Sequence, residues 1–322
     1  MLDRYGRKID YIRISVTDRC NLRCVYCMPE EGVKWMDHSE ILSYEDMLRI
    51  CRVLAELGVH KIKLTGGEPL VRKGLAWFVE QLKKIPGIDS VTLTTNGLLL
   101  GEQLPGLVEA GLDGVNISLD TLNATQFAAI TRRPGLEKVL AALDAALKVP
   151  GLNVKLNCVP TGDNENQLTE LAALAKDQPL SVRFIELMPI GLGRQFEPRS
   201  EEEVRGLLEQ AFGPMTPYDG RLGNGPSHYF SLPGFKGKIG FISAISHQFC
   251  SECNRVRLTA TGYLKTCLQY ETGADLRPYL AQEEAVLSRI IQQTVFEKPL
   301  SHHFAEGAVA DGEEHIMSQI GG

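Results

Sequence analysis

Three cysteines with a short, regular spacing are the residues of this chain that most plainly suggest chemistry. Cys20, Cys24 and Cys27 form a C-x3-C-x2-C pattern directly behind a predicted strand. Cysteine thiolates hold iron–sulfur clusters, and a [4Fe–4S] cluster normally takes four of them. Three ligands leave one iron open to bind and activate a small molecule. From the spacing alone, an incomplete zinc site or cysteines packed as small apolar residues explain the pattern equally well.

A second cysteine group lies far along the chain. Cys250 and Cys253 are followed by Cys267, which gives a C-x2-C-x13-C spacing. With His247 the pattern becomes H-x2-C-x2-C-x13-C, a ligand set that suits a structural Cys3His zinc site. The residues themselves favour zinc and an iron–sulfur cluster equally.

Composition limits the classes of protein to consider. The chain has 322 residues, 43% of them hydrophobic, which is enough for one large core or two smaller ones. Its net charge of −6 argues against a broad nucleic-acid-binding face. Eight cysteines, with no apolar signal segment and no membrane-spanning run, indicate a cytoplasmic metal-binding protein. Cys51 and Cys158, outside both groups, are interpreted as buried apolar residues.

The elements that would position the first cysteine group follow an alternating order. Six strands are predicted, each with a helical segment behind it, at 11–16, 61–65, 90–95, 114–119, 153–159 and 181–187. Repeated β-then-α units predict a parallel sheet with right-handed crossovers. The first cysteine group follows a strand end, where barrel-type α/β folds place their active sites. An open doubly wound sheet would give much the same pattern.

The pattern changes after Leu187. Proline and glycine crowd residues 189–233 around one predicted helix at 201–212. Strands are predicted at 238–245 and 257–265, the second turning at 261–262, and they flank the second cysteine group. We therefore expect a core at 1–190 and a C-terminal region at 191–322.

The cysteine loop, with Tyr26 before its last cysteine, resembles that of the radical S-adenosylmethionine superfamily. The superfamily's second mark, Gly-Gly-Glu-Pro, stands here at residues 66–69. The resemblance implies an α/β fold built on a partial (β/α)6 TIM-like barrel. It also implies that S-adenosylmethionine chelates the open iron, and that one electron from the reduced cluster cleaves it to a 5′-deoxyadenosyl radical.

The later motifs make the resemblance more specific. The chain carries C-x2-C-N-R-x-R, a third cysteine fourteen residues on, and a Gly321–Gly322 ending. In these features it resembles the GTP 3′,8-cyclases of molybdenum cofactor biosynthesis. That family implies a second [4Fe–4S] cluster, on Cys250, Cys253 and Cys267, whose open iron binds the guanine of GTP. The radical would take the C3′ hydrogen of GTP, and the C3′ radical would attack C8.

The same resemblance assigns roles to individual residues. It implies S-adenosylmethionine contacts from four residues and GTP contacts from six. The first set is Tyr26, Gly67, Ser118 and Met188; the second is Arg13, Lys63, Thr94, Lys155, Arg255 and Arg257. Candidate catalytic residues are Arg255, Arg257, Gly321 and Gly322, with the glycine tail expected to enter the barrel beside the substrate.

The family resemblance also implies partners for the protein, and two other interpretations of the chain stay open. The resemblance implies a low-potential donor of the flavodoxin or ferredoxin type, and a cyclic pyranopterin monophosphate synthase that uses the product. No nucleic acid or membrane partner is expected, and the sequence leaves open whether the protein is a monomer or a homodimer. The family usually has arginine where this chain has Lys63, and lysine lacks the planar fork that grips phosphate bidentately. The alternatives are another radical S-adenosylmethionine enzyme with an auxiliary cluster and a zinc-stabilised binding protein without catalysis.

Overall fold

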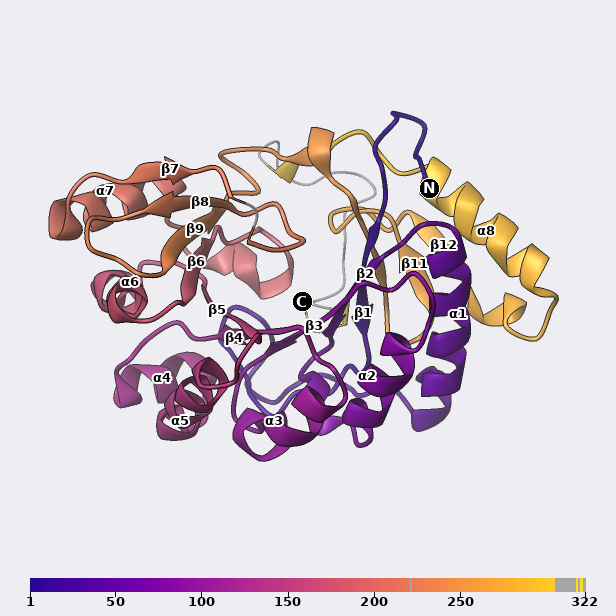
Figure 1. Cartoon of the computed structure of the whole chain (residues 1–322), viewed down its shortest axis with the longest axis horizontal. Helices are drawn as coiled ribbons and strands as arrows, with labels where there is room; N and C mark the ends of the chain where they lie inside the picture. Colours follow the sequence, from indigo (N-terminus) through magenta and orange to yellow (C-terminus); the bar gives the residue numbers. More distant parts are fainter. Residues whose placement is uncertain (221, 305–316, 318, 321–322) are drawn as a thin grey trace.

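A single mixed β-sheet organises the molecule. The computed structural model describes residues 1–220, 222–304, 317 and 319–320, and these contain twelve strands in the order β12-β11-β10-β1-β2-β3-β4-β5-β6-β9-β8-β7. The sheet curves, with helices α1 to α5 along its outer side (Figure 1). Its two ends are different strands that do not pair with each other, so the barrel is partial.

The six strands predicted from the sequence are present and parallel. They are β1 (Tyr11–Ser15), β2 (Lys61–Thr65), β3 (Ser90–Thr95), β4 (Gly114–Ser118), β5 (Asn153–Cys158) and β6 (Ser181–Ile185). Each pairs with the next along the chain, as βαβ units with right-handed crossovers require. The predicted fold class, a partial (β/α)6 barrel with a C-terminal extension, is confirmed.

The C-terminal strands extend this sheet at both ends. β9 (Lys238–Ile242) pairs in parallel with β6, and β10 (Arg255–Leu258) pairs in parallel with β1. Antiparallel strands complete each end: β8 (His228–Ser231) and β7 (Thr216–Tyr218) beyond β9, and β11 (Tyr263–Lys265) and β12 (Gly273–Asp275) beyond β10. The strand expected at 257–265 is thus a hairpin. The division at residue 190 stays a prediction.

The strands alternate buried apolar residues with polar ones. In β1, Ile12 and Ile14 face the helices and are fully buried, whereas Tyr11 and Arg13 line a central cavity. β2 repeats the pattern, with Ile62 and Leu64 in the core and Lys63 on the cavity side. Successive side chains of a strand point to opposite faces, so these sequences place their charges inside the barrel.

The helices form the outer layer. They are α1 (Tyr44–Glu56), α2 (Leu75–Lys83), α3 (Leu100–Glu109), α4 (Ala124–Thr131), α5 (Leu136–Leu147), α6 (Leu168–Asp177), α7 (Glu201–Phe212) and α8 (Glu284–Phe296). The side chain of Ser43 caps α1 by accepting from the Asp46 amide, a position that serine favours. The sequence interpretation did not identify α8, which packs beside α1 (Figure 1). No described helix has the length and apolar character needed to span a membrane.

Candidate active site

One large cavity occupies the barrel, with a volume of about 600 Å³. Every predicted site residue that the structure describes lines it: the six cluster cysteines, the four S-adenosylmethionine contacts and the six GTP contacts. Gly321 and Gly322 lie outside the described residues. The described lining carries eight lysines and arginines against four aspartates and glutamates. An acidic chain therefore encloses a cationic chamber.

The first cysteine loop is fastened to the end of α4. The amides of Arg23 and Val25 donate to the carbonyls of Thr131 and Ile130, at 3.0 and 2.9 Å. Arg132 has a left-handed backbone (φ 55°), and its guanidinium donates to the carbonyls of Arg23 and Met28, at 3.1 and 3.0 Å. Arg132 thus helps to fix the loop between Cys20 and Met28, a role that sequence reasoning missed.

Gly66 and Gly67 let two loops pack at backbone contact. A Cβ on Gly67 would lie 2.4 Å from the carbonyl oxygen of Arg19, and one on Gly66 would lie 2.6 Å from that of Thr17. Both distances are too short for a carbon atom beside a backbone oxygen. The amide of Gly67 also donates to the Thr17 carbonyl at 2.8 Å. The paired glycines therefore bring the segment after β2 directly against the cysteine loop.

Glu68 ties the same two loops to the end of β3. One carboxylate oxygen accepts from the Leu70 amide at 3.0 Å and from the Thr95 hydroxyl at 2.7 Å; the other accepts from the Asn96 amide at 2.7 Å. Burial raises the pKa of Glu68 to about 7, although these donors favour the charged form. The Asn96 side chain in turn donates to Asn21, beside Cys20, at 2.7 Å.

The thiols of the first group lie in an unfavourable setting for uncompensated thiolates. Burial raises the pKa of Cys20 to about 11, and burial with the neighbouring thiols and Asp120 raises the pKa of Cys24 well above its usual value. A coordinating metal removes the thiol proton outright. These three side chains line one chamber and interact electrostatically with one another, so the donor set fits a cluster with three cysteine ligands.

Tyr26 and Asp120 link the cysteine loop to β4. The Tyr26 hydroxyl donates to the Asp120 carboxylate at 2.6 Å, and the Val159 amide donates to the other oxygen of that carboxylate at 2.8 Å. Burial raises the pKa of Asp120, although both hydrogen bonds lower it. Ser118 and Met188 line the cavity with Tyr26, so the predicted S-adenosylmethionine contacts share one chamber.

The second cysteine group lies on a short turn before β10. Cys250 and Cys253 are separated by one helical turn, and Cys267 follows β11. Burial raises the pKa of Cys253, but the charges of Lys298, Arg255 and Arg7, with a backbone hydrogen bond, lower it to about 7. Because the thiolate is the metal-binding form, this setting favours ligation.

His247 does not join this group. Its Nδ1 lies 3.4 Å from one carboxylate oxygen of Glu201, and the other oxygen of that carboxylate lies 2.7 Å from Nε2 of His228. The imidazole is two-thirds exposed and is not among the residues that line the cavity. The Cys3His zinc alternative therefore lacks its histidine in this arrangement.

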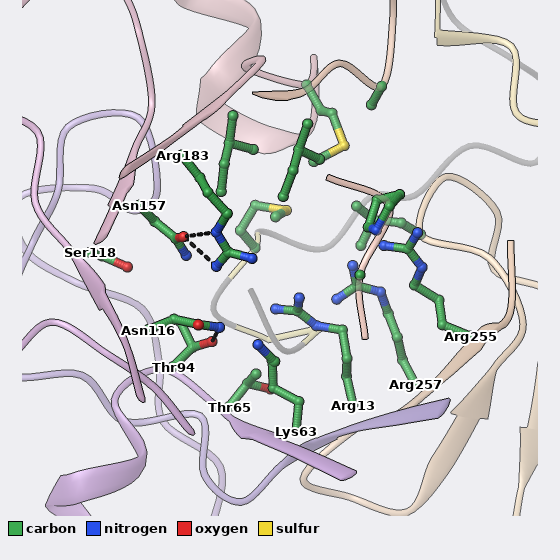
Figure 2. A pocket seen from close by; sticks show the side chains of 18 of the residues that line it. Arg13, Lys63, Thr65, Thr94, Asn116, Ser118, Asn157, Arg183, Arg255 and Arg257 are labelled. Atoms are coloured by element: carbon green, nitrogen blue, oxygen red, sulfur yellow. Dashed lines mark hydrogen bonds between the residues drawn. The ribbon is translucent and has the colours of Figure 1, made fainter. Parts of the chain in front are cut away.

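Three cations stand side by side at one level of the sheet. Arg257 on β10 pairs with Arg13 on β1, and Arg13 pairs with Lys63 on β2. All three line the cavity, and their side chains turn toward one space together with Arg255 (Figure 2). Like charges on neighbouring strands repel, so this row is suited to receive an anion with several charges.

Lys63 and Lys155, two of the lysines that line the chamber, are buried, each 8% exposed. Burial and the surrounding cations lower the pKa of Lys63 well below its usual value, and burial with Arg183 lowers the pKa of Lys155 to about 7. The Nζ of Lys155 donates to the Leu222 carbonyl. Lys63 has no ion-pair partner among the residues described. Both positions favour a ligand that brings negative charge.

Arg183 is the main cavity cation that the sequence interpretation missed. Its guanidinium donates to the side-chain oxygen Oδ1 of Asn157 at 3.0 and 2.5 Å and faces the cation row across the chamber (Figure 2). The sequence contained a signal for Arg183, because Val182-Arg183-Phe184 places a charge within an apolar strand, as Ile62-Lys63-Leu64 does. Thr94 lies on the same side as Asn116, whose amide donates to its hydroxyl at 3.4 Å.

Comparison with protein families divides the chain into two matches. Residues 14–175 match the model of the radical SAM superfamily, and residues 180–304 match the model described as molybdenum cofactor synthesis C. The first covers the cysteine loop, the end of β1 and all of β2 to β5, and the second covers β6 and the later cysteine group.

Similar proteins share the full length of the chain. GTP 3′,8-cyclases of Clostridium perfringens (strain 13) and Pelotomaculum thermopropionicum are 42% and 46% identical, with both chains covered completely. Streptococcus suis SuiB, solved with S-adenosylmethionine, has the same fold at 15% identity, with a TM-score of 0.62 over 91% of this chain and 67% of its own. The chain belongs to the GTP 3′,8-cyclase family of the radical SAM superfamily.

Proposed function

We propose that this protein converts GTP to (8S)-3′,8-cyclo-7,8-dihydroguanosine 5′-triphosphate in the first step of molybdenum cofactor biosynthesis. The observation that carries the proposal is the row Arg257, Arg13 and Lys63, which lies in one chamber with both cysteine groups. The cation row suits a triphosphate, and the cysteine groups suit two [4Fe–4S] clusters. The reaction in the proposal is that of the relatives, which are named GTP 3′,8-cyclases.

The first three cysteines would hold the cluster that binds S-adenosylmethionine, and the last three would hold the second cluster. When bound, the first cluster supplies the electron that cleaves S-adenosylmethionine and so initiates the radical chemistry at C3′ of GTP. The protein itself must position the ligands, because S-adenosylmethionine and GTP have to be held in a defined orientation relative to each other. Tyr26, Gly67, Ser118 and Met188 would receive the first ligand near the ends of β1 to β6.

The cavity cations would hold GTP at the other end. Arg13, Lys63 and Arg257 would bind the triphosphate, with Arg183 opposite them, and Lys155 and Thr94 line the same cavity. Arg255 lies next to the second cysteine group and stacks on Phe249, with its guanidinium carbon 4.9 Å from the ring centre. Its buried Nε has no hydrogen-bond partner among the described residues, so it can donate to a ligand. Gly321 and Gly322 remain candidates from sequence alone.

The cellular setting forms part of the same proposal. None of the eight cysteines is in a disulfide, which agrees with the expected cytoplasmic location. The reaction needs a low-potential electron donor of the flavodoxin or ferredoxin type, and a cyclic pyranopterin monophosphate synthase would use its product.

Single cysteine substitutions test this division of labour. Cys24→Ala should abolish reductive cleavage of S-adenosylmethionine, since the first cluster loses a ligand. Cys253→Ala should still release 5′-deoxyadenosine but form no cyclised nucleotide. Both products are measured by chromatography after anaerobic reconstitution, with iron and zinc counted per chain. Cyclised nucleotide at the wild-type rate from Cys253→Ala, or zinc bound in place of iron, would contradict the assignment.

A further inference from the structure

Lys298 is a buried cation to which no role has yet been given. It lies two residues after α8, is 3% exposed and lines the cavity. No carboxylate of the described residues lies within ion-pair distance of its Nζ. A buried ammonium without a counter-charge is costly, so its presence indicates an anion nearby in the working protein.

The contacts of Lys298 and its neighbours surround the second cysteine group. Its Nζ donates to the carbonyl of Thr266, the residue before Cys267. Four residues on, the His302 amide donates to the Cys250 sulfur at 3.5 Å. The segment 298–302 therefore spans the space between the loop of Cys250 and the loop of Cys267.

Arg7 fastens the same segment from the N-terminal side. Its guanidinium donates to the carbonyls of Pro299 and Leu300, at 2.6 and 2.8 Å, and to that of Cys250 at 2.8 Å. Its charge is balanced, because the buried carboxylate of Asp3 lies 2.5 Å from its Nε. Lys298 differs in this respect: it performs a similar bridging role without a carboxylate among the described residues.

Lys298 lines the same cavity as Cys250, Cys253 and Cys267. The cavity therefore offers these thiolates a fixed positive partner at this end.

We propose that Lys298 is the counter-charge and positioning residue of the iron–sulfur cluster held by Cys250, Cys253 and Cys267. A cluster with three thiolate ligands is an anion, and its negative charge grows on reduction. The ammonium compensates this charge while its bond to Thr266 holds the Cys267 loop. The proposal rests on the proposed function only in taking a cluster to be present at this site. It does not depend on what happens to GTP.

The test separates charge from packing. Lys298→Met keeps the length of the side chain and removes the charge, Lys298→Arg keeps the charge, and Lys84→Met removes an exposed lysine elsewhere as a control. All three are made in a Cys24→Ala background, so that the second cluster alone gives the paramagnetic signal. Iron content and the midpoint potential are then measured by redox titration followed by electron paramagnetic resonance.

Loss of the charge should disfavour reduction of the second cluster. In Lys298→Met the equilibrium constant for its one-electron reduction should fall about tenfold or more, a shift of about 59 mV to lower potential. Failure of the second cluster to assemble in Lys298→Met, with assembly in Lys298→Arg, would support the same role. Lys298→Arg and Lys84→Met should keep the parent potential.

Two results would overturn the proposal. One is a parent-like iron content and potential in Lys298→Met. The other is an equal loss in Lys298→Met and Lys298→Arg, since that would show that packing rather than charge matters. A wild-type protein that holds both clusters but leaves GTP unchanged would refute the proposed function and leave this test valid.

Discussion

GTP binding should be accompanied by proton uptake in the cavity, and the pKa of Lys155 gives the number of protons expected. With a pKa of about 7, its amine is about 10% protonated at about pH 8 in the free protein. A triphosphate nearby favours the charged form and should raise this pKa by about two units or more. Lys155 would then be about 90% protonated, a gain of about 0.8 proton per GTP. Lys63, whose pKa is also lowered, would add to this gain.

Calorimetry measures this uptake directly. The apparent binding enthalpy at about pH 8 is compared in two buffers with different ionisation enthalpies, using the protein with both clusters and no S-adenosylmethionine. The phosphates themselves titrate near pH 6 and contribute little. Lys155→Met should take up about 0.8 proton fewer than the wild type, whereas the exposed Lys84→Met should match it. Wild-type binding without proton uptake, or equal uptake in Lys155→Met, would refute the reasoning.

The same lowered pKa affects stability before any ligand binds. An unfolded lysine titrates near 10.5, so between about pH 7 and 10.5 the unfolded chain binds more protons than the folded one. The contribution of Lys155 to the free energy of unfolding therefore rises with pH in this window, by up to about 1.4 kcal/mol per pH unit. Denaturant titrations of the ligand-free protein should show a smaller slope against pH in Lys155→Met.

Three substitutions test the two ends of the cavity. Gly67→Ala should push the loop after β2 away from Arg19, lower stability by about 1–3 kcal/mol and reduce 5′-deoxyadenosine release; unchanged release would show that the close approach is dispensable. Glu68→Gln should cost about 1–3 kcal/mol in denaturation, because its amide cannot accept from all three donors at Leu70, Thr95 and Asn96; no loss would contradict this role. Arg257→Ala should weaken GTP binding about 10- to 150-fold and spare S-adenosylmethionine in equilibrium binding, and equal loss of both ligands would instead indicate misfolding.

Much of the fold and of the candidate site could be predicted from local patterns in the sequence. The six core strands were predicted within two residues at each end, because each alternates apolar and polar residues between turn-forming segments. The cysteine spacings marked both candidate cluster sites, and the sequence places Lys63 and Lys155 as charges between apolar residues of strands. Arg183 carried the same signal and was overlooked. These features depend on neighbours along the chain, which a sequence displays directly.

Other features depend on contacts between distant segments. The sequence identified β10 as part of a strand, but only the fold shows that it lies beside β1 and so places Arg257 next to Arg13. Gly67 was expected to contact S-adenosylmethionine, and only the fold shows that Gly66 and Gly67 also admit the backbone of the cysteine loop.

The pairing of Lys298 with the second cysteine group likewise joins segments far apart in the chain. The sequence by itself determined which residues carry charge, thiols and turns, because those are local properties. The tertiary structure decided which of them share one cavity and how burial and neighbouring charges change their pKa values, because strand order and burial arise only when the whole chain packs.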